Sequence, residues 1–363
     1  LPQEGIEDAD VYFVGCLPAE VAPSEQDTVS LDLATSHRCC PVFLGADLKD
    51  RYYRRFCKQQ LWPLLHYLTP LAPTSPGRFD PDLWAAYVKA NKAFADKLME
   101  VVASEEDMVC GGGGGEGGEG WWTPQAPSLT RPPFPSLQVW VHDYHLLVLP
   151  SLLRKRLHRA RVGLFLHSPF PSSEIFRAFP RREEILRSML NADLVGFHTF
   201  DYARHFLSCC SRMLGIEHVT SRGSIGLDYY GRTVGLKIMP TGVKPDRFLD
   251  GVSWPDTAWR AGELASQLEG QTVLLGVDDL DAFKGIELKM LAVERVLDAH
   301  PEWRGRLTLV QVSNAPRGGS ADVDALVEFL GATVARVNGK YGAPAPTPAA
   351  LVGAGPGGGS GGP

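Results

Sequence analysis

The stretch VWVHDYHLLVLP, residues 139–150, joins a short apolar, β-rich run to a loop with two histidines and an aspartate. The next such run, GLFLHSPFPSSE (163–174), also ends in a histidine, here followed by a proline-rich turn. Further apolar runs that indicate strands are 10–17, 41–44, 194–197, 234–240, 272–277 and 307–312. Helical patterns separate most of these runs, which is typical of βαβ units in a mostly parallel sheet. The sequence therefore predicts an α/β fold.

One long helix is predicted over 80–102, DPDLWAAYVKANKAFADKLMEVV. Asp80 suits the N-cap, and Pro81 suits the first helical position. The apolar residues of this segment recur at helical spacing, and Asn91 interrupts the apolar stripe.

With 363 residues, the chain is longer than most single cores, so about two domains are expected. We expect the first over 1–250 and part of a second over 270–340, because two strands cannot complete a doubly wound sheet. Residues 110–136 and 341–363 are rich in glycine and proline. We expect a flexible insert in the first and a low-complexity tail in the second. A translated intron or alternative exon explains the insert better than a functional lid does.

Composition excludes several classes of protein. The net charge of −6 gives no electrostatic footprint for nucleic acid or for an anionic membrane. No apolar stretch nears the roughly 20 residues of a membrane-spanning helix. The seven cysteines form no C-x-x-C motif, which argues against a zinc site or a disulfide framework. We therefore expect reduced thiols, a cytoplasmic location, and neither a metal nor another cofactor.

Charged and polar residues follow several of the predicted strands. In doubly wound folds, ligands bind at the carboxyl ends of parallel strands, and Asp143, His167, Lys284 and Arg317 all have such places. Aspartate and histidine suit sugar hydroxyls, whereas lysine and arginine suit phosphates. Simpler explanations stay open for each residue alone: a metal-binding H-x-x-H in the loop, a loop histidine with internal partners, and solvated surface cations.

The segment GVDDLDAFKG (276–285) combines two opposed features. Lys284 and Gly285 stand at a predicted helix start, where free backbone N–H groups and the positive helix end suit a phosphate. Three carboxylates precede them, those of Asp278, Asp279 and Asp281. Carboxylates repel a phosphate, so the two features of this segment predict opposite preferences for a phosphate ligand.

Several motifs resemble the glycosyltransferase family of trehalose-6-phosphate synthases, in order and in spacing. They are YYRRFCKQQLWPLLHY (52–67), VWVHDYHLLVLP, GLFLHSPFPSSEIFR (163–177), DLVGFHTFDYARHFL (193–207) and RVNGKYG (336–342). GSIGLDYYGRT (223–233) and GVDDLDAFKGI look most like the plant class II members. The resemblance covers about 10–340 apart from the insert. It implies two Rossmann-like domains of the GT-B type, the second incomplete here.

The resemblance also implies substrates and roles. Glucose 6-phosphate would bind on the N-terminal side and UDP-glucose mainly on the C-terminal side, with retaining transfer that needs no metal. By motif, Tyr53 and Trp62 match contacts to the acceptor's phosphate and sugar. Asp143 matches the acceptor-side catalytic carboxylate, and His167 the catalytic histidine that contacts the donor glucose. Lys284 matches the lysine that binds the UDP diphosphate, and Arg317 an arginine that reaches the acceptor phosphate.

One departure from the family pattern affects the donor site. Active members carry V-[D/E]-R-L-D-Y-x-K-G, and Asp279 stands where the arginine of that motif clamps the diphosphate. A glycine-rich donor loop would precede residue 1, and donor carboxylates would follow residue 341. We therefore expect weak or no glucosyl transfer. A non-catalytic sugar-phosphate-sensing protein with regulatory partners, or a fragmentary gene model, are the alternatives.

Overall fold

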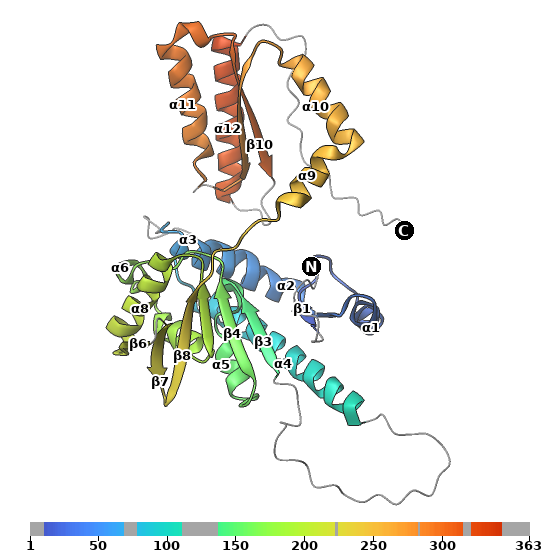
Figure 1. Ribbon diagram of the computed structural model, residues 1–363, viewed down its shortest axis with the longest axis vertical. Coiled ribbons are helices and arrows are strands. Elements are labelled where there is room, and N and C mark those ends of the chain that lie inside the picture. The colour runs from blue at the N-terminus through green and yellow to red at the C-terminus, as the bar shows by residue number, and fades with distance from the viewer. Residues whose placement is uncertain are drawn as a thin grey trace, which may run out of the picture. The chain divides into compact units, whose positions relative to one another are not determined.

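The computed structural model describes residues 11–68, 78–110, 137–221, 224–281, 284–314 and 321–342. The chain divides into two compact units, Leu1–Thr241 and Gly242–Pro363 (Figure 1). Nearly all of the predicted insert, and all of the predicted tail beyond its first two residues, lie outside the described residues.

A six-stranded sheet organises the N-terminal unit, with the order β3-β4-β5-β8-β7-β6. Its strands are β3 (Gln138–His142), β4 (Arg161–Leu166), β5 (Leu194–Phe197), β6 (His218–Ser221), β7 (Ser224–Tyr229) and β8 (Arg232–Ile238). The pairs β3–β4, β4–β5 and β5–β8 are parallel, whereas β6 pairs with β7, and β7 with β8, in antiparallel fashion. The predicted α/β class is confirmed.

The prediction missed the hairpin strands β6 and β7. A tight two-residue turn joins β7 to β8, and both of its residues, Tyr230 and Gly231, have positive φ. Such a turn matches the right-handed twist of the flanking strands. In the sequence, the sign of this turn was the YG pair between two β-rich runs.

Two further short strands, β1 (Phe13–Gly15) and β2 (Cys39–Pro41), pair in parallel beside the main sheet. The first lies inside the predicted run 10–17. The second starts earlier than the predicted run 41–44 and overlaps it only at Pro41.

Helices precede, connect and cover the strands. Those of the N-terminal unit are α1 (Gln26–His37), α2 (Ala46–Lys49), the π-helix η1 (Asp50–Leu61), α3 (Trp62–Leu65), α4 (Pro81–Cys110), η2 (Tyr144–Leu146), α5 (Leu149–Arg154), α6 (Ser173–Phe176), α7 (Arg182–Met189) and α8 (Phe200–Leu214). Helix α4 begins where predicted. The carboxylate of Asp80 caps it by accepting from the Asp82 N–H at 2.8 Å.

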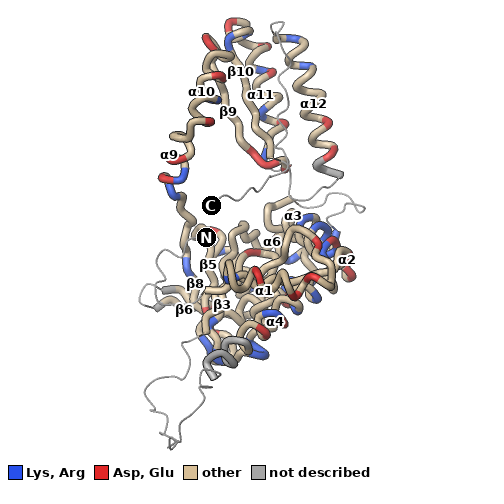
Figure 2. Tube along the Cα trace, turned by 90° about the vertical axis from the view of Figure 1, so that its right-hand side faces the viewer, with Lys and Arg blue, Asp and Glu red and all other residues tan. Residues whose placement is uncertain are grey.

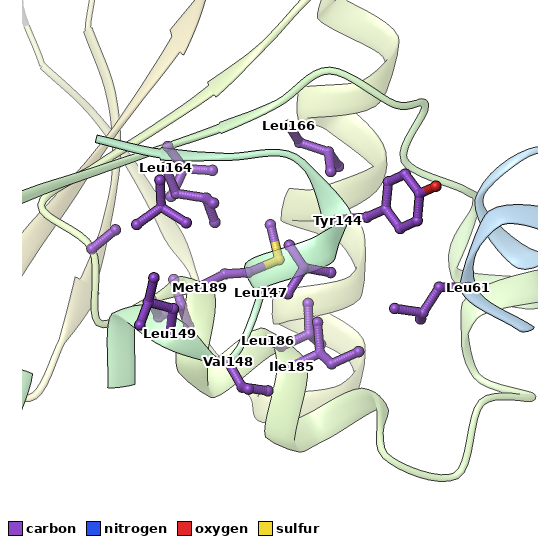
Figure 3. Packing of buried hydrophobic residues seen from close by; sticks show 14 of the residues in the cluster. Leu61, Tyr144, Leu147, Val148, Leu149, Leu164, Leu166, Ile185, Leu186 and Met189 are labelled. Atoms are coloured by element: carbon purple, nitrogen blue, oxygen red, sulfur yellow. The ribbon is translucent and has the colours of Figure 1, made fainter. Parts of the chain in front are cut away.

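The core of this unit lies between the sheet and its helices. Figure 3 shows leucines of β4 and of the segment after β3 facing the side chains of α7. The buried residues in that view include Leu147, Leu149, Leu164, Leu166, Ile185, Leu186 and Met189. Tyr144 borders this cluster, and its hydroxyl points away from the leucines (Figure 3). The segment after β3 is therefore anchored by apolar packing on one side.

The C-terminal unit has two parallel strands, β9 (Thr272–Asp279) and β10 (Leu307–Asn314). Its helices are α9 (Pro245–Ser253), α10 (Pro255–Gln267), α11 (Ile286–Ala299), η4 (Pro301–Trp303) and α12 (Ala321–Tyr341). A small cluster of Ile286, Leu326 and Leu330 joins α11 to α12. On β9, the side chains of Leu275 and Val277 stay largely exposed.

Within the described ranges, no helix combines the length and the apolar composition that crossing a bilayer requires.

Candidate functional site

The loop after β3 starts with a strained residue. Asp143 has φ 64° and ψ −179°, a conformation found almost only for glycine. Its N–H donates to the Phe165 carbonyl at 2.8 Å, and its Oδ1 accepts from the Ser168 N–H at 3.0 Å. Such strain costs about 1–3 kcal/mol and persists where the surroundings fix it, which is common at functional sites. The Asp143 carboxylate thus links the ends of β3 and β4.

Three histidines follow the ends of neighbouring strands. The His142 Nδ1 and the His167 Nε2 are 3.1 Å apart, and the rings of His167 and His198 are 5.5 Å apart. Partial burial lowers the pKa of His167, and the neighbouring imidazoles add to this while Asp143 opposes it. A hydrogen bond between two imidazoles needs one ring to donate and the other to accept. The lowered pKa favours the neutral form of His167, and the hydrogen bond with His142 orients its ring.

The π-helix η1 and the first residue of α3 place three side chains on one face, those of Tyr53, Lys58 and Trp62. Tyr53 and Trp62 are nine residues apart, about two and a half turns of α-helix, which would put them on opposite sides. In the wider i→i+5 winding of a π-helix, nine residues make about two turns. Pro63 lacks an N–H and clashes with the carbonyl four residues before it, which favours a wider winding just upstream.

These side chains meet the loop after β3. The Tyr53 ring stacks on His145, with ring centroids 5.6 Å apart and planes at 17°. The Trp62 ring packs against Tyr144 at 5.6 Å. The Lys58 ammonium lies 4.7 Å from the Trp62 ring and 5.7 Å from the Tyr53 ring. Aromatic faces, a cation and the Asp143 loop therefore form one neighbourhood.

The predicted acceptor-side residues fall into this neighbourhood as far as they are described. Tyr53 and Trp62 contact the loop that starts at Asp143, and Asp143 bonds the residue after His167. Arg317 lies outside the described residues.

Lys58 and His145 also belong to this neighbourhood. From the sequence, Lys58 had no predicted role, and His145 had one only in the metal-binding H-x-x-H alternative. Lys58 comes four residues before Trp62, a spacing that also shares a face in an α-helix, and five after Tyr53, a spacing that shares a face only with π-helical winding. Pro63 was the feature of the sequence that could have indicated this winding.

The pKa of His145 gives a testable pH dependence. Burial lowers it to about 4, with Asp143 opposing and Lys58 adding to the decrease. In the unfolded chain the ordinary value is about 6.5, so between pH 6.5 and 4 the unfolded state binds a proton that the folded state does not. We expect unfolding of the N-terminal unit to become easier by about 2 kcal/mol from pH 7 to pH 5 through this group. Urea titrations followed at amide signals of β4 measure it.

The matched comparison for this pH dependence uses His145→Gln and His158→Gln. His158 is exposed, so its loss leaves the pH slope unchanged, whereas His145→Gln flattens it. An equal slope in the wild type and in His145→Gln would contradict the assignment.

The C-terminal unit carries the other predicted residues, at the end of β9. Figure 2 shows acidic residues there. Asp278 accepts from Lys289 Nζ at 2.5 Å and from Gln311 Nε2 at 2.8 Å, and these bonds lower its pKa. Asp278 therefore ties β9 to β10 and α11.

Asp279 and Lys284 are both exposed at this end of β9. The Asp279 Oδ1 accepts from Asn314 Nδ2 at 3.2 Å. Gly285 has φ 69° as the N-cap of α11, so the chain turns there into a helix whose first N–H groups suit an anion. The cation and the helix end favour phosphate, while the Asp279 carboxylate opposes it.

Across the described segments, no group of three or more His, Cys, Asp or Glu side chains could hold a metal ion.

Comparison with known proteins gives consistent relatives. The model of glycosyltransferase family 20 matches residues 3–110 and 136–354. Alpha,alpha-trehalose-phosphate synthase (UDP-forming) 6 of Arabidopsis thaliana is 49% identical over 96% of this chain, which spans 37% of that protein. A UDP-forming alpha,alpha-trehalose-phosphate synthase A of Dictyostelium discoideum is 36% identical, over 92% of this chain and 40% of its own length.

Solved structures share the fold. The N-terminal domain of Candida albicans trehalose-6-phosphate phosphatase is 29% identical, with a TM-score of 0.69 over 89% of this chain and 62% of its own. A Burkholderia xenovorans trehalose-phosphate synthase solved with glucose 6-phosphate, 24% identical, has a TM-score of 0.68 over 84% of this chain and 60% of its own. The fold is thus that of GT-B trehalose-phosphate synthases, and the chain belongs to glycosyltransferase family 20.

Proposed function

We propose that the N-terminal unit binds glucose 6-phosphate, as the acceptor site of a trehalose-6-phosphate synthase-like domain. The observation that carries this proposal is the convergence of the Tyr53 and Trp62 rings, the Lys58 ammonium and the strained Asp143 carboxylate. Aromatic rings pack against sugar faces, carboxylates accept from sugar hydroxyls, and an ammonium attracts phosphate. The Burkholderia relative bound to glucose 6-phosphate supports this ligand.

UDP-glucose is the second substrate of the proposed reaction. His167 would contact the donor glucose, with Asp143 beside it as the other catalytic residue, and Lys284 at the start of α11 would bind the diphosphate. Asp279 places a carboxylate where the family motif has a fork-shaped cation, which opposes the donor's charge. Glucosyl transfer to glucose 6-phosphate is therefore weak or absent in this chain.

A sugar-phosphate-sensing protein is the second candidate function, and Asp279 is the observation that favours it. Such a protein keeps the acceptor site, loses donor binding and acts through regulatory partners. Trehalose 6-phosphate formation separates the two functions: a synthase forms it from both substrates, whereas a sensor binds glucose 6-phosphate and forms none.

The cysteines support a cytoplasmic location for either function. Those of the described residues are free thiols, Cys40, Cys57, Cys209 and Cys210 among them buried. Burial raises the pKa of the Cys209 thiol to about 12, which keeps it protonated and unreactive.

Lys58→Met tests the acceptor site by calorimetry. Methionine keeps most of the packing length and removes the charge, so the Kd for glucose 6-phosphate should rise roughly fivefold. Binding of unphosphorylated glucose should not change, because it lacks the group that Lys58 attracts.

Lys155→Met is the control, since Lys155 is exposed at the end of α5. If the wild-type chain gives no heat of binding with millimolar glucose 6-phosphate, the proposed function is wrong. An unchanged Kd in Lys58→Met would remove Lys58 from the site.

A further inference from the structure

A buried amide breaks the apolar stripe of α4. Asn91 has no exposed surface, and its Nδ2 donates to the Tyr87 carbonyl at 2.9 Å and to the His145 carbonyl at 3.2 Å. The first bond lies within the helix, whereas the second leaves it and reaches the loop after β3. A buried polar side chain in an apolar face costs desolvation, so its bond to the loop is the feature that needs explaining.

Two buried tyrosines hold the same loop. The Tyr87 hydroxyl donates to the Tyr144 carbonyl at 2.8 Å and accepts from the Leu147 N–H at 2.9 Å. The Tyr52 hydroxyl donates to the His145 carbonyl at 3.1 Å. Side chains of η1 and α4 thus bond three successive parts of the loop backbone, at 144, 145 and 147. Hydrogen bonds of this kind restrain the backbone that they reach, although among the described residues the Asn91 Oδ1, the Tyr144 hydroxyl and the His145 Nε2 have no partner.

Asp143 directly precedes this clamped stretch. Its positive φ is unfavourable for a residue with a side chain, so without restraint the loop would relax to an ordinary conformation. Relaxation would swing the carboxylate away from the Ser168 N–H that it now accepts from. The clamp at 144–147 is positioned to prevent this.

We propose that Asn91 and Tyr87 are positioning residues: they fix the 144–147 backbone, so that Asp143 keeps its strained conformation and presents its carboxylate to the ligand. For the identity of that ligand, glucose 6-phosphate, the inference rests on the proposed function. The positioning itself concerns the protein alone and has a readout without ligand.

Asn91→Leu tests the inference against Asn191→Leu. Leucine has the same branched arrangement of side-chain heavy atoms as asparagine, with bulkier methyl groups at the tip, and cannot bond the His145 carbonyl. Asn191 makes the same kind of bond, from its Nδ2 to the Arg187 carbonyl at 2.9 Å, but its side chain bonds no residue of the loop. The two residues match in the bond to a carbonyl four residues earlier; they differ in the bond to the loop and in burial, because Asn191 is partly exposed.

Hydrogen exchange in the full chain is the first readout. In Asn91→Leu, the Ser168 amide should exchange roughly tenfold faster, while the amides of Leu164 and Val195 in the sheet keep their protection. Asn191→Leu should leave Ser168 unchanged. Equal acceleration throughout the sheet, or a Ser168 amide that stays protected, would overturn the proposal. Tyr87→Phe, which removes one hydroxyl, gives the same reading if Asn91→Leu does not fold.

Glucose 6-phosphate affinity is the second readout. We expect the Kd to rise roughly fivefold in Asn91→Leu and to stay unchanged in Asn191→Leu. If the wild type does not bind glucose 6-phosphate, the proposed function fails and exchange at Ser168 still decides the positioning role. If the wild type binds and Asn91→Leu binds equally well, the positioning role fails and the proposed function stands.

Discussion

Replacing Asp143 with alanine will weaken glucose 6-phosphate binding roughly a hundredfold, which corresponds to about 2.7 kcal/mol. The substitution removes a charged acceptor for sugar hydroxyls, and hydrogen bonds to charged groups contribute about 1.5–3 kcal/mol each. It also removes the bond from the Ser168 N–H, which helps to hold the strained conformation. The loop can then relax, so the loss includes orientation as well as charge. Isothermal calorimetry on the 363-residue chain measures the Kd.

Two companion variants sharpen the Asp143 prediction. Asp143→Asn keeps an oxygen that can accept from the Ser168 N–H and loses only the charge, so its Kd should rise roughly tenfold. Asp201→Ala removes an exposed carboxylate on α8 and should bind like the wild type. Equal affinity of Asp143→Ala and the wild type would show that the sugar does not meet this carboxylate.

Asp279→Arg will raise the affinity for UDP by roughly tenfold or more, a change that needs only about 1.4 kcal/mol. The arginine replaces a repelling carboxylate with a planar cation that can donate two hydrogen bonds to phosphate. Lys284 and the start of α11 already stand at the same end of β9. We expect no trehalose 6-phosphate to appear, because one cation restores charge but does not orient both substrates.

The control for the UDP prediction is Asp256→Arg, which makes the same change of charge at an exposed position of α10. It should leave UDP binding as it is. If both variants bind UDP more tightly than the wild type and to the same extent, the net charge of the chain, rather than position 279, governs the affinity for UDP. If neither binds more tightly than the wild type, position 279 does not face the diphosphate.

The sequence predicted the central strands well because their signal is local. The runs that became β3, β4 and β5 are apolar, short and followed by helices, and the structure pairs them in parallel. The strands β6 and β7 were missed because little in the sequence marks them: the turn that joins β7 to β8 lies in one dipeptide, Tyr230–Gly231. The pattern of apolar residues could not show the π-helical winding of η1. For that reason it could not show that Tyr53 and Trp62 share a face.

The candidate site, too, could be predicted only in part from the sequence. Asp143 and His167 follow strands, so the α/β rule placed them correctly at neighbouring strand ends. The positive φ of Asp143 and the bond from Asn91 to the His145 carbonyl depend on contacts between residues far apart in the chain. In the sequence, Asn91 was recognisable only as a polar interruption of an apolar stripe. Its bond to the loop after β3 can be seen only in the tertiary structure.

An amide NMR titration of the whole chain with glucose 6-phosphate shows whether the segment after β3, together with η1, forms the proposed site. We expect saturable shifts at Tyr53, Lys58, Asp143 and Ser168, with unchanged amides on the exposed helix α1, and a weaker response to glucose alone. Saturable shifts confined to other segments, or none at millimolar glucose 6-phosphate, would contradict this proposal.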